Sequence, residues 1–213
     1  MEFLVSMTTV VPDGTAPEAV DDIRTREAAR SRQLAAAGEL LRLWRPPLQP
    51  GEWRTLGLFS APDADALEAA LASMPLRVWR TDEVTLLSPH PNDPERADTD
   101  GGGAEFFVTF TVMVPDDTPD ADAQRAFVSE ATRARELAAE GHLQRLWRLP
   151  APAAGESSSL GLWRARDARE MQSMVESLPL LPWMGVEIAP LSPHPSDPGT
   201  AAVGVRSQPS NNG

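Results

Sequence analysis

The feature that most constrains this sequence is a pattern that occurs twice. The N-terminal stretch EFLVSMTTVVPDGT returns as EFFVTFTVMVPDDT, LLRLWR returns as LQRLWR, and LSPHPND returns as LSPHPSD. Trp147 follows Trp44 by 103 positions and His194 follows His90 by 104, so the second copy contains one additional residue. A period of about 100 residues is too long for a solenoid unit and is typical of a compact domain. The sequence therefore predicts a tandem duplication of one small domain.

Composition restricts the class of protein. Hydrophobic residues make up 41% and charged residues 23% of the chain, as in ordinary globular proteins. The absence of cysteine excludes disulfide scaffolds, thiolate metal sites and thiol nucleophiles. A net charge of −12 repels phosphate backbones, so no nucleic-acid partner is expected. No apolar run reaches the roughly 20 residues that cross a bilayer, and the N-terminus lacks a signal-peptide pattern. We therefore expect no membrane partner and a cytoplasmic location.

Each copy has the same predicted order of elements. In the first copy, β-rich segments predict strands at 3–11, 40–45, 53–60 and 79–87, and helical patterns cover 17–37 and 63–74. Gly38 suits the left-handed residue that commonly follows a helix, and Pro75 ends the second helix. The order βαββαβ is the ferredoxin-like arrangement of the α+β class, in which both helices cover one face of a four-stranded sheet.

The second face of each predicted sheet needs a partner, because an apolar face is rarely left exposed. We therefore expect two ferredoxin-like βαββαβ domains that pack sheet to sheet as an intrachain pseudo-dimeric α+β barrel. The predicted boundaries are a first repeat at 1–94, a flexible acidic and glycine-rich linker at 95–104, a second repeat at 105–198 and a disordered tail at 199–213. A homo-oligomer formed through outer sheet edges or arms is a further expectation.

A glutamate falls on the apolar stripe of the first helix in both copies. Glu27 follows Ile23 by four positions, and Glu130 follows Phe127 by three, so each shares a helix face with apolar residues. Burial raises the pKa of a carboxyl group and brings it towards the range useful for a general acid or base. Glu27 and Glu130 are therefore the candidate catalytic residues. The alternative interpretation is a shifted helix register in which both carboxylates face water.

Tryptophan and arginine occur together on the second strand of each copy. A Trp wall with a nearby guanidinium can receive a small planar carboxylate, which makes Trp44, Arg45, Trp147 and Arg148 candidate substrate-binding residues. Side chains alternate along a strand, so Trp44 shares a face with Arg42 while Arg45 points the other way. Core packing of Trp and solvent exposure of Arg is the alternative.

Two histidines complete the candidate set. His90 and His194 lie in SPHP segments after the last strand of each copy, where either could reach the mouth of a pocket or serve as a polar turn residue. Three dispersed histidines without cysteine predict no metal site. The sequence also lacks a glycine-rich phosphate loop and a G-x-S-x-G elbow, so chemistry without a cofactor is expected.

These motifs together resemble the muconolactone delta-isomerase family. The resemblance rests on EFLVSMTTVVP, the helix with Glu27, LWR at 43–45, MPLRVW at 74–79 and the His-Pro pair, and it covers nearly all of each copy. The second copy, with LPLLPWM, is closer to the LPLFPYM-like segment of the family. The resemblance implies ferredoxin-like α+β barrels that associate through their sheets into rings and shift a double bond in a small lactone acid without a cofactor.

The resemblance also assigns roles to particular residues. Glu27 and Glu130 match the helix glutamate that removes and returns a proton, and the LWR strand that carries Arg45 and Arg148 lies near the pocket. The chain departs from the family at Ser6 and Thr109, where the family often carries Lys, and at Pro89 and Pro193, where it has Arg. Cationic groups that could hold a lactone carboxylate are missing from these positions, which leaves the substrate open.

Three functions follow from these observations. The first is a cofactor-independent isomerase or cyclase that acts on a small unsaturated lactone or a related specialised metabolite. The second is a duplicated ligand-binding or assembly protein without chemistry. The third is a cofactor-free monooxygenase of the wider dimeric α+β barrel group.

Overall fold

A computed structural model of the 213-residue chain describes residues 1–95, 102–151, 153 and 155–199. Most of the predicted linker at 95–104 and nearly all of the predicted tail at 199–213 lie outside these residues. Contacts divide the chain into two compact units. Unit 1 is Met1–Leu86 together with the segment that begins at Ser192, and unit 2 is Leu87–Leu191. The end of each repeat therefore belongs to the unit built by the other repeat.

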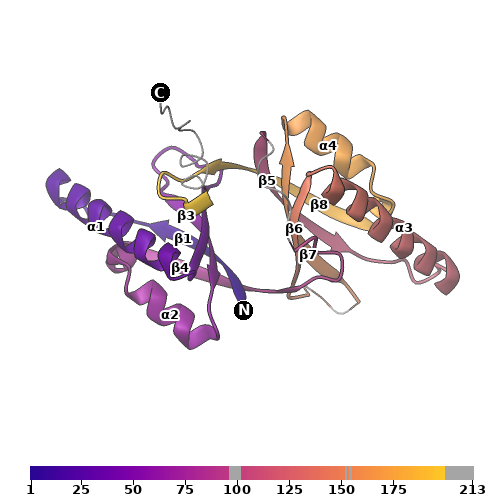
Figure 1. The fold of residues 1–213 in the computed structure, drawn as a ribbon, viewed down its shortest axis with the longest axis horizontal. Helices are drawn as coiled ribbons and strands as arrows, with labels where there is room; N and C mark the ends of the chain where they lie inside the picture. The colour runs from indigo at the N-terminus through magenta and orange to yellow at the C-terminus, as the bar shows by residue number, and fades with distance from the viewer. Residues whose placement is uncertain (96–101, 152, 154, 200–213) are drawn as a thin grey trace, which may run out of the picture. The chain divides into compact units, whose positions relative to one another are not determined.

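The element order βαββαβ predicted for each repeat is the order observed (Figure 1). Repeat 1 contains β1 (Glu2–Thr9), α1 (Pro17–Ala36), β2 (Leu40–Arg45), β3 (Arg54–Ser60), α2 (Ala64–Ala72), the 3₁₀ helix η1 (Pro75–Trp79) and β4 (Arg80–Pro89). Repeat 2 contains β5 (Ala104–Val112), α3 (Asp120–Ala139), β6 (Leu143–Leu149), β7 (Ser157–Ala165), α4 (Ala168–Glu176), the 3₁₀ helix η2 (Leu181–Trp183) and β8 (Met184–Pro193).

The sheet of each unit has five strands, four of its own and the end of a fifth. In unit 1 the order is β4, β1, β3, β2 and then the end of β8, where Trp44 of β2 pairs with Pro193. In unit 2 the order is β8, β5, β7, β6 and then the end of β4, where Pro89 pairs with Trp147. The exchange places the SPHP segment of each repeat beside the LWR strand of the other. Packing of the two repeats sheet to sheet stays a prediction, as does a homo-oligomer.

The helices end where the sequence indicated. Gly38 follows α1 with φ 73° and Gly141 follows α3 with φ 81°, a backbone conformation that glycine adopts without strain. Asp63 caps α2 and Asp167 caps α4, each by accepting a backbone N–H with its side chain. The 3₁₀ turns were not predicted. Each has a proline at its first or second position, Pro75 in η1 and Pro182 in η2, where the missing backbone N–H breaks no helical hydrogen bond.

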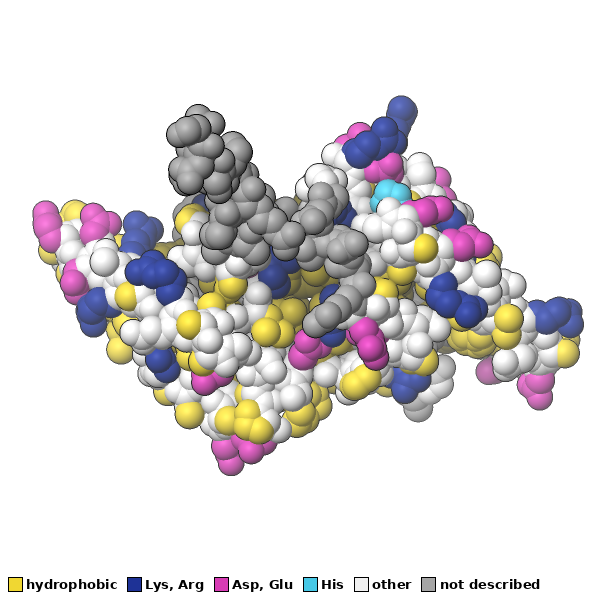
Figure 2. All heavy atoms as spheres, viewed as in Figure 1, with side chains coloured by type: hydrophobic (Ala, Val, Ile, Leu, Met, Phe, Trp, Pro, Cys, Tyr) yellow, Lys and Arg dark blue, Asp and Glu magenta, His cyan; other side chains and the backbone are white. Residues whose placement is uncertain are grey.

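Each unit has its own apolar core between helices and sheet. In unit 1 the core includes Val5, Leu34, Phe59 and Leu71, and in unit 2 it includes Val108, Leu137 and Met171 with their neighbours. The outer helix surfaces are polar, and Figure 2 shows acidic and basic side chains interspersed on one face of the molecule. Several of these charges pair along α1 and α3, as Arg26 does with Asp22 and Arg133 with Glu136. Such exposed pairs stabilise a fold only slightly.

The predicted inward stripes agree with the structure in part. Ile23, Ser31 and Leu34 of α1 are buried, as are Ala134 and Leu137 of α3. Phe127 differs from the expectation because it is 42% exposed. It lies one turn before Glu130 and lines the same cavity as that residue.

Candidate active site

Each unit contains a cavity between its first helix and its sheet, and the helix glutamate lies in its lining. The cavity of unit 1 has a volume of about 380 Å³ and includes Glu27, Arg45 and His194. The cavity of unit 2 has a volume of about 610 Å³ and includes the equivalent residues Glu130, Arg148 and His90. The structure thus brings together six of the eight candidate residues, three in each cavity.

The two glutamates are held in the same way by the chain that follows the second helix. Leu76 N–H donates to Oε2 of Glu27 at 2.8 Å, and Leu180 N–H donates to Oε2 of Glu130 at 3.0 Å. These amides belong to the MPL and LPL segments at the 3₁₀ turns, which explains the presence of that motif in both copies. Burial raises the pKa of both carboxyl groups, and the hydrogen bond from the backbone opposes this increase.

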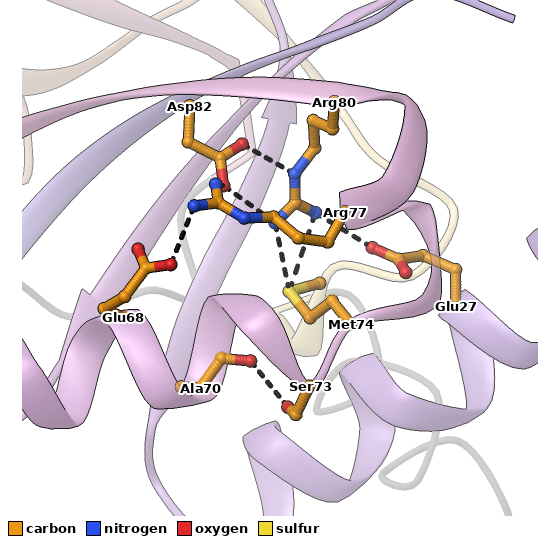
Figure 3. A network of polar contacts seen from close by, with 8 residues as sticks. All are labelled: Glu27, Glu68, Ala70, Ser73, Met74, Arg77, Arg80 and Asp82. Carbon is orange, nitrogen blue, oxygen red and sulfur yellow. Dashed lines mark hydrogen bonds and ion pairs between the residues drawn. The ribbon is translucent and has the colours of Figure 1, made fainter.

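The remaining surroundings of Glu27 are strongly polar (Figure 3). Nη1 of Arg80 lies 3.1 Å from Oε1 of Glu27, and Nε of Arg80 lies 2.6 Å from Oδ1 of Asp82. The side chains of Arg80 and Asp82 are each only 2% exposed. Arg77 forms a second ion pair with Asp82 and reaches Glu68 at 2.7 Å. Both oxygens of Glu27 are therefore occupied, one by a backbone amide and one by a buried guanidinium.

Glu130 has no such network. Met184 and Val186 stand at the first and third positions of β8, where β4 carries Arg80 and Asp82. Within the described part of the chain, Glu130 forms no ion pair and its Oε1 has no hydrogen-bond partner. The equivalent carboxylates therefore lie in different electrostatic environments. Glu27 forms an ion pair with an arginine in unit 1, and Glu130 forms none with the described residues of unit 2.

The histidines reach the cavities through the exchanged ends. Nδ1 of His90 accepts the backbone N–H of Asn92, and Nδ1 of His194 accepts that of Ser196, each at 3.1 Å. A neutral ring whose Nδ1 is an acceptor carries its proton on Nε2. Desolvation lowers the pKa of both rings, and the nearby cations Arg148 and Arg45 lower it further. Each cavity therefore gains a neutral imidazole that can donate a hydrogen bond.

The environment of His194 gives a pH prediction. Burial, Arg45 and the opposing charge of Asp197 together place its pKa at about 4, against an ordinary 6.5. The folded protein binds this proton less readily than the unfolded chain, so the stability that His194 contributes is present above pH 6.5 and is lost as the pH falls towards 4. NMR titration of the ring should give this low midpoint, and Arg45→Gln should raise it. A midpoint at the ordinary value would contradict the buried placement.

The tryptophans of the LWR strands do not line the cavities, contrary to their expected role as pocket walls. Trp44 and Trp147 are 0% and 1% exposed and lie under the guanidinium groups of Arg42 and Arg145, each 4.8 Å from the indole ring. The strand alternation explains the difference, because Arg45 and Arg148 point to the opposite face and do line the cavities.

Arg42 and Arg145 instead hold the exchanged ends. Asp197 accepts from Arg42 and from Leu43 N–H at 2.9 Å, and Asp93 accepts from Arg145 and from Leu146 N–H at 3.0 Å. The side chain of Asp197 is 0% exposed. The final Asp of HPND and HPSD is therefore the anchor that positions the histidine three residues before it.

Several residues that line the cavities are not among the site residues predicted from the sequence. In unit 1, Arg24 lies over the ring of Trp53 at 4.5 Å and both line the cavity. In unit 2, Phe127 and Ser157 occupy the equivalent positions, and Trp163 of β7 also lines the cavity. The replacement of Arg24 by Phe127 is already visible when the two repeats are aligned in sequence. The described residues contain no group of three metal-ligating side chains, and none of their helices is long and apolar enough to span a membrane.

Comparisons with known proteins identify relatives of this chain in sequence and in fold. The chain is 31% identical over 91 residues to the muconolactone delta-isomerase of Cupriavidus pinatubonensis, a match that covers 43% of this chain and 95% of that protein. It is 30% identical over 94 residues to the enzyme of Rhodococcus opacus, with 44% and 97% covered. The structure of a heme-binding protein from Thermus thermophilus matches 95% of both chains at a TM-score of 0.56 and 13% identity, a likeness of fold alone. The sequence pattern of the muconolactone delta-isomerase family matches residues 1–93 and again 104–197, so the chain belongs to this family of isomerases and contains two copies of its unit.

Proposed function

We propose that the protein is a cofactor-independent isomerase that moves a proton with the carboxylate of Glu130 on a small unsaturated lactone or a related specialised metabolite. The observation that supports this proposal most directly is the position of Glu130 in a cavity with only one hydrogen bond to its carboxylate. It lies in a cavity of about 610 Å³, burial raises its pKa, and a single backbone amide fixes it. A carboxylate with one oxygen anchored and the other unpaired is suited to accept a proton from a bound molecule.

The reaction needs a base, a hydrogen-bond donor and no redox partner. Oε1 of Glu130 removes a proton from a carbon that is conjugated with a carbonyl group through a C=C bond, and the C–H electron pair passes through the conjugated system onto the carbonyl oxygen. The neutral His90 donates a hydrogen bond to the oxygen as it gains negative charge, and Arg148 contributes positive charge to the same cavity. Glu130 then returns the proton to a different carbon of the conjugated system. The double bond has moved and the carboxylate is regenerated.

We assign turnover to unit 2 and not to unit 1. In unit 1, Arg80 and the Leu76 amide occupy both carboxylate oxygens of Glu27. Removing a proton from a ligand would require Glu27 to break a buried ion pair first. Breaking such a pair is costly because it leaves a guanidinium without its partner in a site that water does not solvate well.

This assignment predicts that unit 1 can be activated. In a Glu130→Gln background, the double substitution Arg80→Met, Asp82→Val copies the residues of β8 into β4. We expect it to increase turnover by about 10-fold over Glu130→Gln alone, because Glu27 gains an unpaired oxygen. The assay is interconversion of lactone isomers followed by NMR, with muconolactone as the probe. The control is the same double substitution with Glu27→Gln, which should abolish the gain.

The same assay separates the proposed function from the two alternatives. Isomerisation that continues at full rate without oxygen excludes a monooxygenase. Incorporation of solvent deuterium at the carbon that receives the proton is the signature of proton transfer. Binding of muconolactone without interconversion or exchange would favour a ligand-binding or assembly protein.

A further inference from the structure

The cavity of unit 2 follows its helix further than the cavity of unit 1 does. On α3 the lining runs from Gln124 to Ala134. On α1 it runs from Arg24 to Ser31, and Arg24 is the equivalent of Phe127. An α-helix rises about 1.5 Å per residue, so a start three positions earlier lengthens this wall by about 4.5 Å. The wall that α3 gives to the cavity is therefore nearly one turn longer.

The longer end of this cavity carries two exposed apolar side chains. Phe127 is 42% and Val128 55% exposed, and both line the cavity. Their equivalents on α1, Arg24 and Thr25, are polar, as exposed helix residues usually are. Neighbouring apolar side chains that remain exposed at a cavity are typical of a surface that a bound molecule covers. We call the part of the cavity beside Gln124, Phe127 and Val128 its outer part.

In unit 1 a pair of side chains fills the equivalent place. Arg24 reaches from α1 to the residue before β3, where its guanidinium lies 4.5 Å from the centroid of the Trp53 ring. In unit 2 the equivalent residues are Phe127 and Ser157, and a serine has no ring that could meet the helix. The space that Arg24 and Trp53 fill in unit 1 is therefore open in unit 2, in agreement with cavity volumes of about 380 and 610 Å³.

The walls of the two cavities also differ in polarity. At four positions that line both cavities, a polar or charged side chain of unit 1 is replaced by an apolar one in unit 2: Arg24 by Phe127, Thr9 by Val112, Ser31 by Ala134 and Arg80 by Met184. Apolar walls favour a ligand with a large apolar surface, because both surfaces leave water on binding. The cavity of unit 2 is thus suited to a longer and more apolar molecule than the cavity of unit 1.

We propose that the substrate of unit 2 carries an apolar arm, which extends from the catalytic carboxylate into the outer part and lies along Phe127 and Val128. The head of this molecule, with the carbonyl group that the reaction requires, lies beside Glu130 and His90. The substrate class is then an elongated unsaturated carbonyl compound with an alkyl or aryl arm. This inference rests on the proposed function, because it takes the cavity of unit 2 as the substrate site.

The test compares two methyl ketones that share a head and differ in chain length, 2-pentanone and 2-nonanone. In full-length protein with ¹³C-labelled methionine methyl groups, Met184 reports on unit 2, and Met7 and Met74 report on unit 1. In unit 2, 2-nonanone should bind about 10-fold more tightly than 2-pentanone, because its additional methylene groups leave water in the outer part. In unit 1 the difference should be less than about 3-fold, since the additional chain remains in water.

A pair of matched variants exchanges this feature between the units. The double substitution Phe127→Arg, Ser157→Trp copies the residues of unit 1 into unit 2 and should reduce the preference for 2-nonanone there to less than about 3-fold. The affinity of unit 2 for 2-pentanone should change by less than about 2-fold, because the short chain does not reach the substituted positions. The reverse substitution, Arg24→Phe, Trp53→Ser, should increase the preference in unit 1 and leave that of unit 2 unchanged.

Three results would overturn the proposal: equal chain-length preferences in the two cavities, a preference that survives Phe127→Arg, Ser157→Trp, or a Met184 signal that neither ketone shifts. A dimer on a sizing column that Phe127→Arg dissociates would assign the exposed side chains to a protein contact instead. The comparison of the two cavities requires no substitution, so it stands even if a variant is unstable. Because binding of the ketones requires no turnover, full activity of Glu130→Gln would refute the proton transfer and leave these results unaffected.

Discussion

Glu130→Gln is expected to reduce kcat for isomerisation by about 100-fold to 10,000-fold, the range that general base catalysis supplies. The amide has the shape of the carboxyl group but cannot accept the proton, so KM should stay close to its original value. Glu27→Gln should leave turnover nearly unchanged, because Arg80 already holds that carboxylate. Muconolactone is the probe in both cases.

The pH profile gives an independent check on the same residue. Burial raises the pKa of Glu130 above its ordinary 4.5, so the acid limb of kcat/KM should lie above pH 4.5. Activity falls as the pH drops through that limb, since the base becomes protonated. Full activity in the double variant Glu27→Gln, Glu130→Gln would refute proton transfer by these glutamates and would require a different base.

Asp197→Ala is expected to reduce the free energy of unfolding by about 3 kcal/mol, in the range for breaking a buried ion pair from one side. The side chain is 0% exposed and holds both Arg42 and the backbone of Leu43. The effect of Asp93→Ala should be smaller, because Asp93 is 10% and Arg145 25% exposed. Urea denaturation followed by tryptophan fluorescence provides the measurement.

Asp197→Asn serves as the matched control, since it keeps an oxygen for the Leu43 amide and removes only the charge. It should recover part of the lost stability. If the anchor also positions His194, the ring signal of Asp197→Ala should move towards that of an exposed histidine. An Asp197→Ala protein with unchanged stability and unchanged His194 signals would show that the anchor is unnecessary.

The helices and strands could be predicted because hydrophobic periodicity and end signals such as Gly38 depend only on residues that are close in sequence. The stripe of α1 and α3 placed Glu27 and Glu130 on the inner face, and both line cavities in the structure. The same local pattern could not show that Glu27 forms an ion pair and that Glu130 does not. What differs is Arg80, which is 53 positions from Glu27 in sequence and meets it only because η1, which directly precedes Arg80, packs against α1.

The roles of the residues in the LWR strands could be predicted only in part, because they too depend on contacts between distant segments. Alternation showed that Trp44 and Arg45 face opposite sides, but not which side contains the cavity. That depends on the exchanged end, where Asp197 binds Arg42 over a separation of 155 residues. No periodicity within one repeat contains information about a segment supplied by the other.

Because of the exchanged ends, each repeat needs the other to complete its cavity. The cavity around Glu27 takes His194 from the end of repeat 2, and the cavity around Glu130 takes His90 from the end of repeat 1. A stop codon just after Leu191 would leave every residue of repeat 1 intact and still remove the histidine from its cavity. Conversely, deleting repeat 1 would deprive Glu130 of His90. Once the copies were joined in this way, their side chains could diverge while neither copy could be discarded without damage to the other.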